Sequence, residues 1–239
     1  MKLVAVVQAR MGSQRLPGKA MLKLDEERLL IDWVLQRVAR AERPSYIVVA
    51  TTQSPEDDVL VNYIEHHYSE VHIFRGSHSD VLSRFMEIDR LYQNDYLLRI
   101  TADCPLVCSK LIDEMFDVVS RNEPIYAANC NQERILKGFD IEFIASKIFP
   151  VIPYHKLSAY ELEHVTPYFY SGEISESDIL NFTYPELKHA LNMNLSIDTK
   201  LDLRFLRELN LVFDLFEKDF YQIIANLDQM LELQKSRKL

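Results

Sequence analysis

The sequence predicts an α/β protein built on a doubly wound, mostly parallel sheet. Short apolar runs rich in Val and Ile alternate with longer stretches of helical periodicity over the first half of the chain. The first run, at 2–9, shows no polar alternation, which is typical of a strand buried on both faces. Strands and helices in this alternation form a parallel sheet through right-handed crossovers, with helices on both faces.

The predicted elements follow one another regularly as far as residue 130. Strands are expected at 2–9, 46–52, 71–76, 96–105 and 124–130. Helices are expected at 29–41, 54–68, 79–93 and 109–122. Ser54, Pro55 and the acidic residues after them mark the start of one helix, and Ser79 is expected to cap the next.

The segment from about 131 to 190 breaks this order, because it is rich in aromatic residues and proline. We expect it to be an insertion or flap packed on the core rather than a separate domain, so that residues 1–239 form a single domain. After it, 192–209 predicts a strand followed by a helix, and 219–239 predicts an amphipathic C-terminal helix.

Composition and charge narrow the class of function. The net charge of -9 argues against a general binder of nucleic acid or of anionic membranes, which relies on many Lys and Arg contacts. No stretch is apolar over the ~20 residues that span a bilayer, and the first apolar run is too short for a secretory signal. The 3 cysteines lack metal-ligand spacing. We therefore expect a cytoplasmic protein with reduced cysteines and neither a nucleic acid nor a membrane as partner.

Three cations crowd the stretch QARMGSQRLPGK, at 8–19, directly after the first predicted strand. Arg10, Arg15 and Lys19 supply positive charge, and Gly12 and Gly18 allow close approach and a turn. Such a loop can hold phosphate oxygens, although a solvated loop is an open alternative. Its glycine spacing fits neither the dinucleotide-binding nor the Walker phosphate motif.

Two acidic residues are predicted to reach the same edge of the sheet. Asp103 ends the strand at 96–105, and Asp198 ends the strand predicted after 192. Ligands of open parallel sheets bind beyond the carboxyl ends of the strands. Two carboxylates beside a cationic loop suit Mg²⁺ bridging a polyphosphate, although each alone is also explained as a helix cap or turn residue.

The loop at 8–19 resembles the A-R-x-x-S-x-R-L-P-G-K signature of the CMP-sugar synthetases, which activate 3-deoxy-manno-octulosonate and sialic-type acids. Motifs of the spore-coat-polysaccharide branch follow in order as ATTQSPEDD, GSHSDVLSRF, RITADCPL, GFDIEF and EHVTPYF. The resemblance runs from residue 8 to about 206. It implies a Rossmann-like fold of the nucleotide-diphospho-sugar transferase type, an inserted segment for dimerisation and acceptor binding at about 131–190, and a homodimer.

The resemblance also implies roles for single residues. Arg15, Lys19 and Asp103 would be catalytic, and Asp103 and Asp198 would hold one or two Mg²⁺ ions. The residues that would bind CTP are Arg10, Gly12, Ser13, Thr51, Arg75, Asp80, Arg84, Arg99 and Ala102. The residues that would face the sugar acceptor are Asp140, Glu142, Glu163 and His164. For His164, capping or a bond to a neighbouring carbonyl is an equal alternative.

The implied activity is CTP-dependent formation of a CMP-activated sugar, of acidic or nonulosonate type, with release of pyrophosphate, for surface polysaccharide or glycan biosynthesis. A sugar-phosphate nucleotidyltransferase that uses another nucleotide and a catalytically silent binding protein of the same fold are the alternatives. The chain departs from the late D-x-D pair of the sialate enzymes, of which it keeps only Asp198. It also reads ADCPL where the octulosonate enzymes have GDEPL, so the acceptor stays open.

Overall fold

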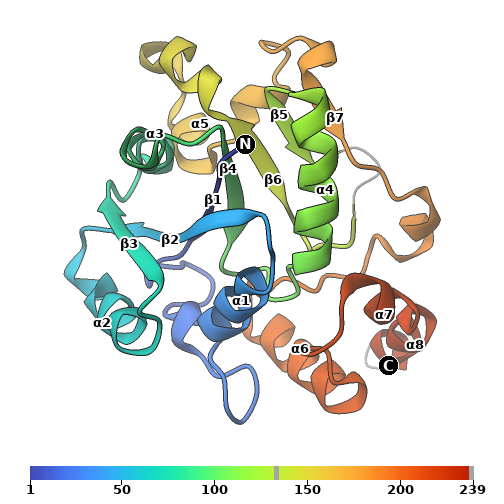
Figure 1. Ribbon diagram of the computed structural model, residues 1–239. Coiled ribbons are helices and arrows are strands. Elements are labelled where there is room, and N and C mark those ends of the chain that lie inside the picture. The colour runs from blue at the N-terminus through green and yellow to red at the C-terminus, as the bar shows by residue number, and fades with distance from the viewer. Residues whose placement is uncertain (132–134, 237–239) are drawn as a thin grey trace.

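The computed structural model describes residues 1–131 and 135–236, and its centre is a seven-stranded sheet in the order β3-β2-β1-β4-β6-β5-β7 (Figure 1). The strands are β1 (Leu3–Gln8), β2 (Pro44–Thr52), β3 (Val71–Gly76), β4 (Tyr96–Thr101), β5 (Tyr126–Ala128), β6 (Glu142–Ala145) and β7 (Ile179–Asn181). β1 to β4 pair in parallel, whereas β6 runs antiparallel to both of its neighbours, β4 and β5. The prediction of an α/β fold with a mostly parallel sheet is confirmed.

Helices cover both faces of this sheet (Figure 1). They are α1 (Leu30–Ala39), α2 (Asp58–His67), α3 (Val81–Tyr92), α4 (Ser109–Asn122), α5 (Ala159–His164), α6 (Lys200–Phe213), α7 (Phe220–Ile224) and α8 (Leu227–Ser236). None of the helices in the described part of the chain is long and apolar enough to cross a membrane.

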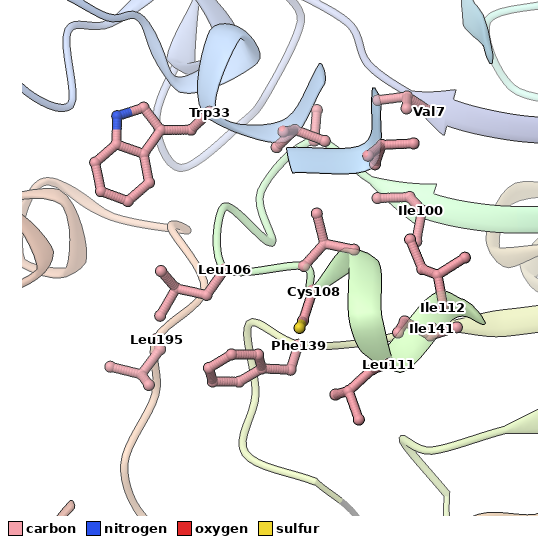
Figure 2. Close-up of a cluster of buried hydrophobic side chains, with 14 of the residues drawn as sticks. Val7, Trp33, Ile100, Leu106, Cys108, Leu111, Ile112, Phe139, Ile141 and Leu195 are labelled. Atoms are coloured by element: carbon pink, nitrogen blue, oxygen red, sulfur yellow. The ribbon is translucent and has the colours of Figure 1, made fainter. Parts of the chain in front are cut away.

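The sheet separates two hydrophobic clusters. α1, α2 and α4 pack on one face, and their cluster includes Trp33, Ile112 and Val7 of β1 (Figure 2). α3 packs on the other face, in a cluster that includes Val4 and Val6 of β1. β1 is therefore buried on both faces, as its unbroken apolar run predicts.

The predicted strand after 192 is wrong. Only an isolated bridge between Asn194 and Lys137 forms there, because Ser196 bonds back to the Asn194 side chain instead of continuing a ladder. The helix predicted over 219–239 is two helices, α7 and α8, which are separated at Ala225 and Asn226. Its last three residues lie outside the described part of the chain.

Two further details differ from the sequence prediction. Asp80, not Ser79, caps α3, and its Oδ1 accepts from the Ser83 backbone at 2.9 Å. The segment at 131–190 supplies β6 and β7 to the sheet, although its sequence predicts no strand. The placement of β6 beside β4 makes part of this segment central to the sheet.

Arg37 of α1 joins the N-terminal half of the chain to its C-terminal region. The side chain is buried, and its nitrogen atoms donate to the carbonyls of Leu106, Val107, Leu215, Phe216 and Lys218. Burial is the largest reason that the pKa of Arg37 falls to about 10, which still leaves it charged at neutral pH.

We expect Arg37→Met to lower the free energy of unfolding by at least about 3 kcal/mol, because several buried carbonyls lose their donor at once. Arg40→Met is the matched control, since the half-exposed Arg40 bonds to Phe216 and Glu217 and is expected to cost less than about 1 kcal/mol. Urea unfolding of the two variants measures both values. Equal effects would contradict the role of Arg37.

Candidate active site

A cavity of 510 Å³ opens where β1 and β4 end. These strands are neighbours, but the chain continues from β1 to β2 on one side and from β4 to β5 on the other, so the strand order reverses between them. The cavity thus occupies the topological switch point, where open α/β sheets bind their ligands. We refer to it as the first cavity.

The loop after β1 is held in shape by backbone hydrogen bonds. The Met11 carbonyl accepts from Ser13 at 2.9 Å and from Gly18 at 2.8 Å. Gly18 has a φ of 68°, in the left-handed region that favours glycine. Met11 also donates its backbone N–H to Asp57 at 2.6 Å, so the loop is fixed to the segment after β2.

Three segments meet at the Lys19 ammonium group. Its Nζ lies 2.8 Å from Asp103 Oδ2, 2.9 Å from the Ile197 carbonyl and 3.3 Å from Asp198 Oδ1. Arg15 Nη2 lies 2.9 Å from Asp198 Oδ1, and Lys137 Nζ lies 3.6 Å from Asp198 Oδ2. We call Arg15, Lys19, Asp103, Lys137 and Asp198 the ion cluster.

Asp103 is charged at neutral pH despite its burial. Burial alone favours the protonated acid, but the charge and hydrogen bond of Lys19, with a bond from Thr101, lower the pKa of Asp103 below its ordinary value. Asp198 is likewise surrounded by cations. Two carboxylates therefore face the cavity beside bound positive charge.

This donor set fits a magnesium ion. Mg²⁺ takes one or two protein carboxylates and completes its shell with water or phosphate oxygens. Asp103 and Asp198 already share one cation, the Lys19 ammonium group. The described residues contain no group of three acidic, His or Cys side chains arranged around a metal, so a metal here would need ligands from a bound substrate.

A second cavity, of 350 Å³, adjoins the first. Both are lined by Arg15, Thr101, Asp103 and Asp198, so the ion cluster lies at their junction. The second cavity is also lined by Asp140 and other polar side chains, which are Arg99, Asn131, Lys137, Glu142, Thr166, Tyr170 and Ser196.

Two buried acids define the second cavity. Burial is the main reason that the pKa of Asp140 rises to about 6, and the Cys104 thiol donates to its Oδ2 at 3.3 Å. Glu142 contacts Arg99 in an ion pair and accepts from the Tyr126 hydroxyl at 2.5 Å. Asp140 thus has no cation within ion-pair distance among the described residues, whereas Glu142 has one.

Residues 4–233 match the family model for cytidylyltransferases. The chain belongs to the cytidylyltransferase family. The structure of a cytidylyltransferase from Leptospira borgpetersenii superimposes with a TM-score of 0.84 and 27% identity, over 100% of this chain and 95% of that one. Membership makes this chain a nucleotidyltransferase, and the fold agrees with that class.

Similar proteins from other organisms show which branch of the family the chain resembles. It is 29% identical to the spore coat polysaccharide biosynthesis protein SpsF of Bacillus subtilis, over 87% of this chain and 85% of that protein. An uncharacterized protein of Methanocaldococcus jannaschii is 34% identical over 96% of this chain and 91% of that protein. The 3-deoxy-manno-octulosonate cytidylyltransferase of Fusobacterium nucleatum is 25% identical over 62% and 60%. The resemblance to the CMP-sugar synthetases is confirmed.

The structure brings most of the predicted site residues of this cytidylyltransferase to the two cavities. Those that line the first cavity are Arg10, Ser13, Arg15, Lys19, Ala102, Asp103, Glu163, His164 and Asp198. Glu163 and His164 were predicted to face the acceptor. They lie beside the cationic loop, where Arg10 Nη2 is 3.3 Å from Glu163 Oε1. The His164 ring packs against Tyr160, with centroids 4.3 Å apart.

Arg99, predicted to bind CTP, lines the second cavity with Asp140 and Glu142. Five predicted CTP ligands are not among the described residues that line either cavity. They are Gly12, Thr51, Arg75, Asp80 and Arg84.

Four of those five residues support neighbouring loops. Buried Thr51 bonds to Asp57 at 2.9 Å, and Arg75 donates to the carbonyls of Thr52 and Ser54. Asp80 caps α3, and Arg84 donates to the carbonyls of Ala50, Ser77 and His78. Their nucleotide roles remain predictions.

Three site residues escape the sequence analysis. Asp57 accepts a hydrogen bond from the Met11 backbone in the cationic loop, Lys137 belongs to the ion cluster, and Gln8 lines the first cavity. Gln8 lies at the end of a predicted strand and opens the cationic loop, so its position was a usable indication. Lys137 precedes GFDIEF, but nothing local indicates its pairing with Asp198, which is distant in sequence.

Titration of Asp140 gives a pH dependence of stability. Its pKa is raised in the folded state, so the protonated acid stabilises the fold at low pH, and this stability is lost as pH rises through about 6. Between about pH 4 and pH 7, we expect Asp140→Asn to gain about 2–3 kcal/mol in the free energy of unfolding relative to the unsubstituted protein. Urea unfolding across this range tests it. Asp178→Asn, at an exposed position, is the control. If the free energy of unfolding of Asp140→Asn varies with pH in the same way as that of the unsubstituted protein, the raised pKa of Asp140 is refuted.

Proposed function

We propose that this chain transfers CMP from CTP to a sugar acceptor and releases pyrophosphate. The observation that carries the proposal is the ion cluster at the junction of a cavity beside the cationic loop and a cavity lined by polar and acidic side chains. A transfer enzyme needs its two substrates to meet at one reacting atom. The α-phosphorus of CTP would lie at this junction.

The first cavity suits the nucleotide. Arg10, Ser13, Arg15 and Lys19 line it and supply three positive charges and a hydroxyl to a triphosphate. Lys19 is held by the two carboxylates near the junction, so it is oriented before the substrate arrives. Such fixed charges favour the transition state, because little reorganisation is needed as charge develops on the leaving pyrophosphate.

Asp103 and Asp198 would hold Mg²⁺ together with phosphate oxygens. When bound, the ion would polarise the phosphoryl group and offset charge on the leaving group. Arg15 is two-thirds exposed in its side chain, so it is free to move from Asp198 to a phosphate.

The second cavity suits the acceptor. We infer a sugar of the acidic or nonulosonate type, which the octulosonate relatives in this family support. Lys137, about half exposed, and Arg15 are the cations that can meet a carboxylate there, while Asp140 and Tyr170 can bond hydroxyl groups. The likeness to the spore coat relative supports a role in surface polysaccharide or glycan biosynthesis.

We also propose that the protein acts as a homodimer and that the segment at 131–190 is an insertion for acceptor binding and dimerisation. Val151, Tyr160 and Tyr170 of this segment expose large apolar side chains, which supports a protein contact there. Asp140 and Glu142 of the same segment line the second cavity, which supports the acceptor role.

Nucleotide binding and transfer test the proposal. We expect CTP with Mg²⁺, at about 100 times its dissociation constant, to stabilise the fold by about 2.7 kcal/mol, and UTP, GTP and ATP to do less. A larger shift with another nucleotide would replace CTP in the proposal. No shift with any of them would favour a catalytically silent protein.

We expect Arg15→Met to lower the rate of pyrophosphate release by about 100-fold or more, because a charge that stabilises the leaving group is lost. Because the Arg15 side chain is two-thirds exposed, we expect its replacement to leave the fold intact. Lys23→Met is the control, since the side chain of the exposed Lys23 bonds only to the Glu26 carbonyl among the described residues. A coupled pyrophosphate assay with candidate nonulosonates measures both, and equal rates would refute the role of Arg15.

A further inference from the structure

One glutamine in the first cavity has a buried group that the protein leaves without a partner. Among the described residues, the buried side-chain polar atoms that make no hydrogen bond are Gln8 Oε1, Asn94 Oδ1 and Arg99 Nε. Asn94 bonds to its neighbours through its side-chain nitrogen, and Arg99 bonds to Glu142 through a different guanidinium nitrogen. Within residues 1–131 and 135–236, Gln8 bonds only through its backbone, whose carbonyl accepts from Ala102 at 3.0 Å.

The fold directs this side chain into the first cavity. Gln8 is the last residue of β1, in register with Ala50 of β2 and Thr101 of β4. Alternate residues of a strand point to the same face, so Gln8 shares the face of Val4 and Val6. There it lines the first cavity, directly before the cationic loop.

An unpartnered buried carbonyl disfavours folding, so its presence calls for a partner in the working state. A triphosphate does not supply that partner, because ionised phosphates only accept hydrogen bonds, and Arg10, Arg15 and Lys19 already serve them. The nucleoside has suitable donors, which are the ribose hydroxyls and the exocyclic amine of cytosine. A neutral amide can accept from such a donor and donate to an adjacent acceptor.

We propose that Gln8 is a specificity-determining residue of the nucleotide site, whose side-chain amide hydrogen-bonds the nucleoside rather than the triphosphate. The inference rests on the proposed nucleotide transfer. It adds to the cationic loop a neutral contact that distinguishes a nucleotide from a bare polyphosphate. It also predicts that stability and binding respond in opposite directions to the loss of the amide.

Gln8→Met tests this, because methionine keeps the length of the side chain and removes both hydrogen-bonding groups. Gln229→Met is the matched control, since Gln229 is exposed on α8 and lines neither cavity. Calorimetric titration with CTP and with tripolyphosphate, each with Mg²⁺, measures affinity. We expect Gln8→Met to weaken CTP about tenfold, in keeping with one or two lost hydrogen bonds, and to leave tripolyphosphate and the control unchanged.

The melting temperature of the ligand-free variant separates binding from structure. We expect Gln8→Met to melt at the same or a higher temperature, because an unpartnered polar group is removed. A lower melting temperature, an equal loss for both ligands or an unchanged affinity for CTP would overturn the proposal.

Two further ligands locate the donor. If Gln8→Met no longer weakens binding when 2′-deoxy-CTP replaces CTP, the donor is a ribose hydroxyl. If it no longer weakens binding when UTP replaces CTP, the donor is the amine of the base. If the unsubstituted protein prefers another nucleotide, the proposed use of CTP fails, and the Gln8 comparison is decided with that nucleotide. If it binds tripolyphosphate but no nucleotide, both proposals fail.

Discussion

The site depends on one largely buried cation, the Lys19 ammonium group. It joins the loop after β1 to Asp103 beyond β4 and to Asp198 before α6, and it also donates to the Ile197 carbonyl. Without a cation between them, the two neighbouring carboxylates would repel each other. The same charge therefore holds together three segments that are distant in sequence, at the edge of the first cavity.

The two acids owe their positions to apolar neighbours. Leu106, Phe139 and Leu195, which are close in sequence to Asp103, Asp140 and Asp198, are buried in one cluster (Figure 2). Gly138 has a φ of 111°, and a Cβ there would lie 2.7 Å from the Leu195 backbone, so only glycine permits this approach. The Ile197 N–H then donates to the Asp103 carbonyl at 2.8 Å. Packing beneath the site thus fixes carboxylates that lie far apart in sequence.

Local pattern was enough to predict β1 to β5 and α1 to α4, because each combines an apolar run or period with a clear boundary. It was also enough to place the cationic loop and Asp103, since both directly follow strands. It failed for β6, whose four residues carry no boundary signal, and for Lys137, whose partner comes from a distant segment. The resemblance placed residues such as Arg84 near the site, but only tertiary packing decides that its donors meet loop carbonyls.

The antiparallel β6 explains why the second cavity is harder to read from sequence than the first. Most residues of the first cavity belong to the ends of the parallel strands β1 and β4 or follow them closely. Glu142 instead reaches the second cavity because β6 pairs with β4 in a register that sets it opposite Arg99. A shift of one residue would turn Glu142 to the other face of the sheet and leave Arg99 as a buried unpaired charge. The ion pair and the register therefore support each other. The second cavity thus depends on a strand pairing between distant segments, while the cations Arg10, Arg15 and Lys19 of the first cavity come from one contiguous loop.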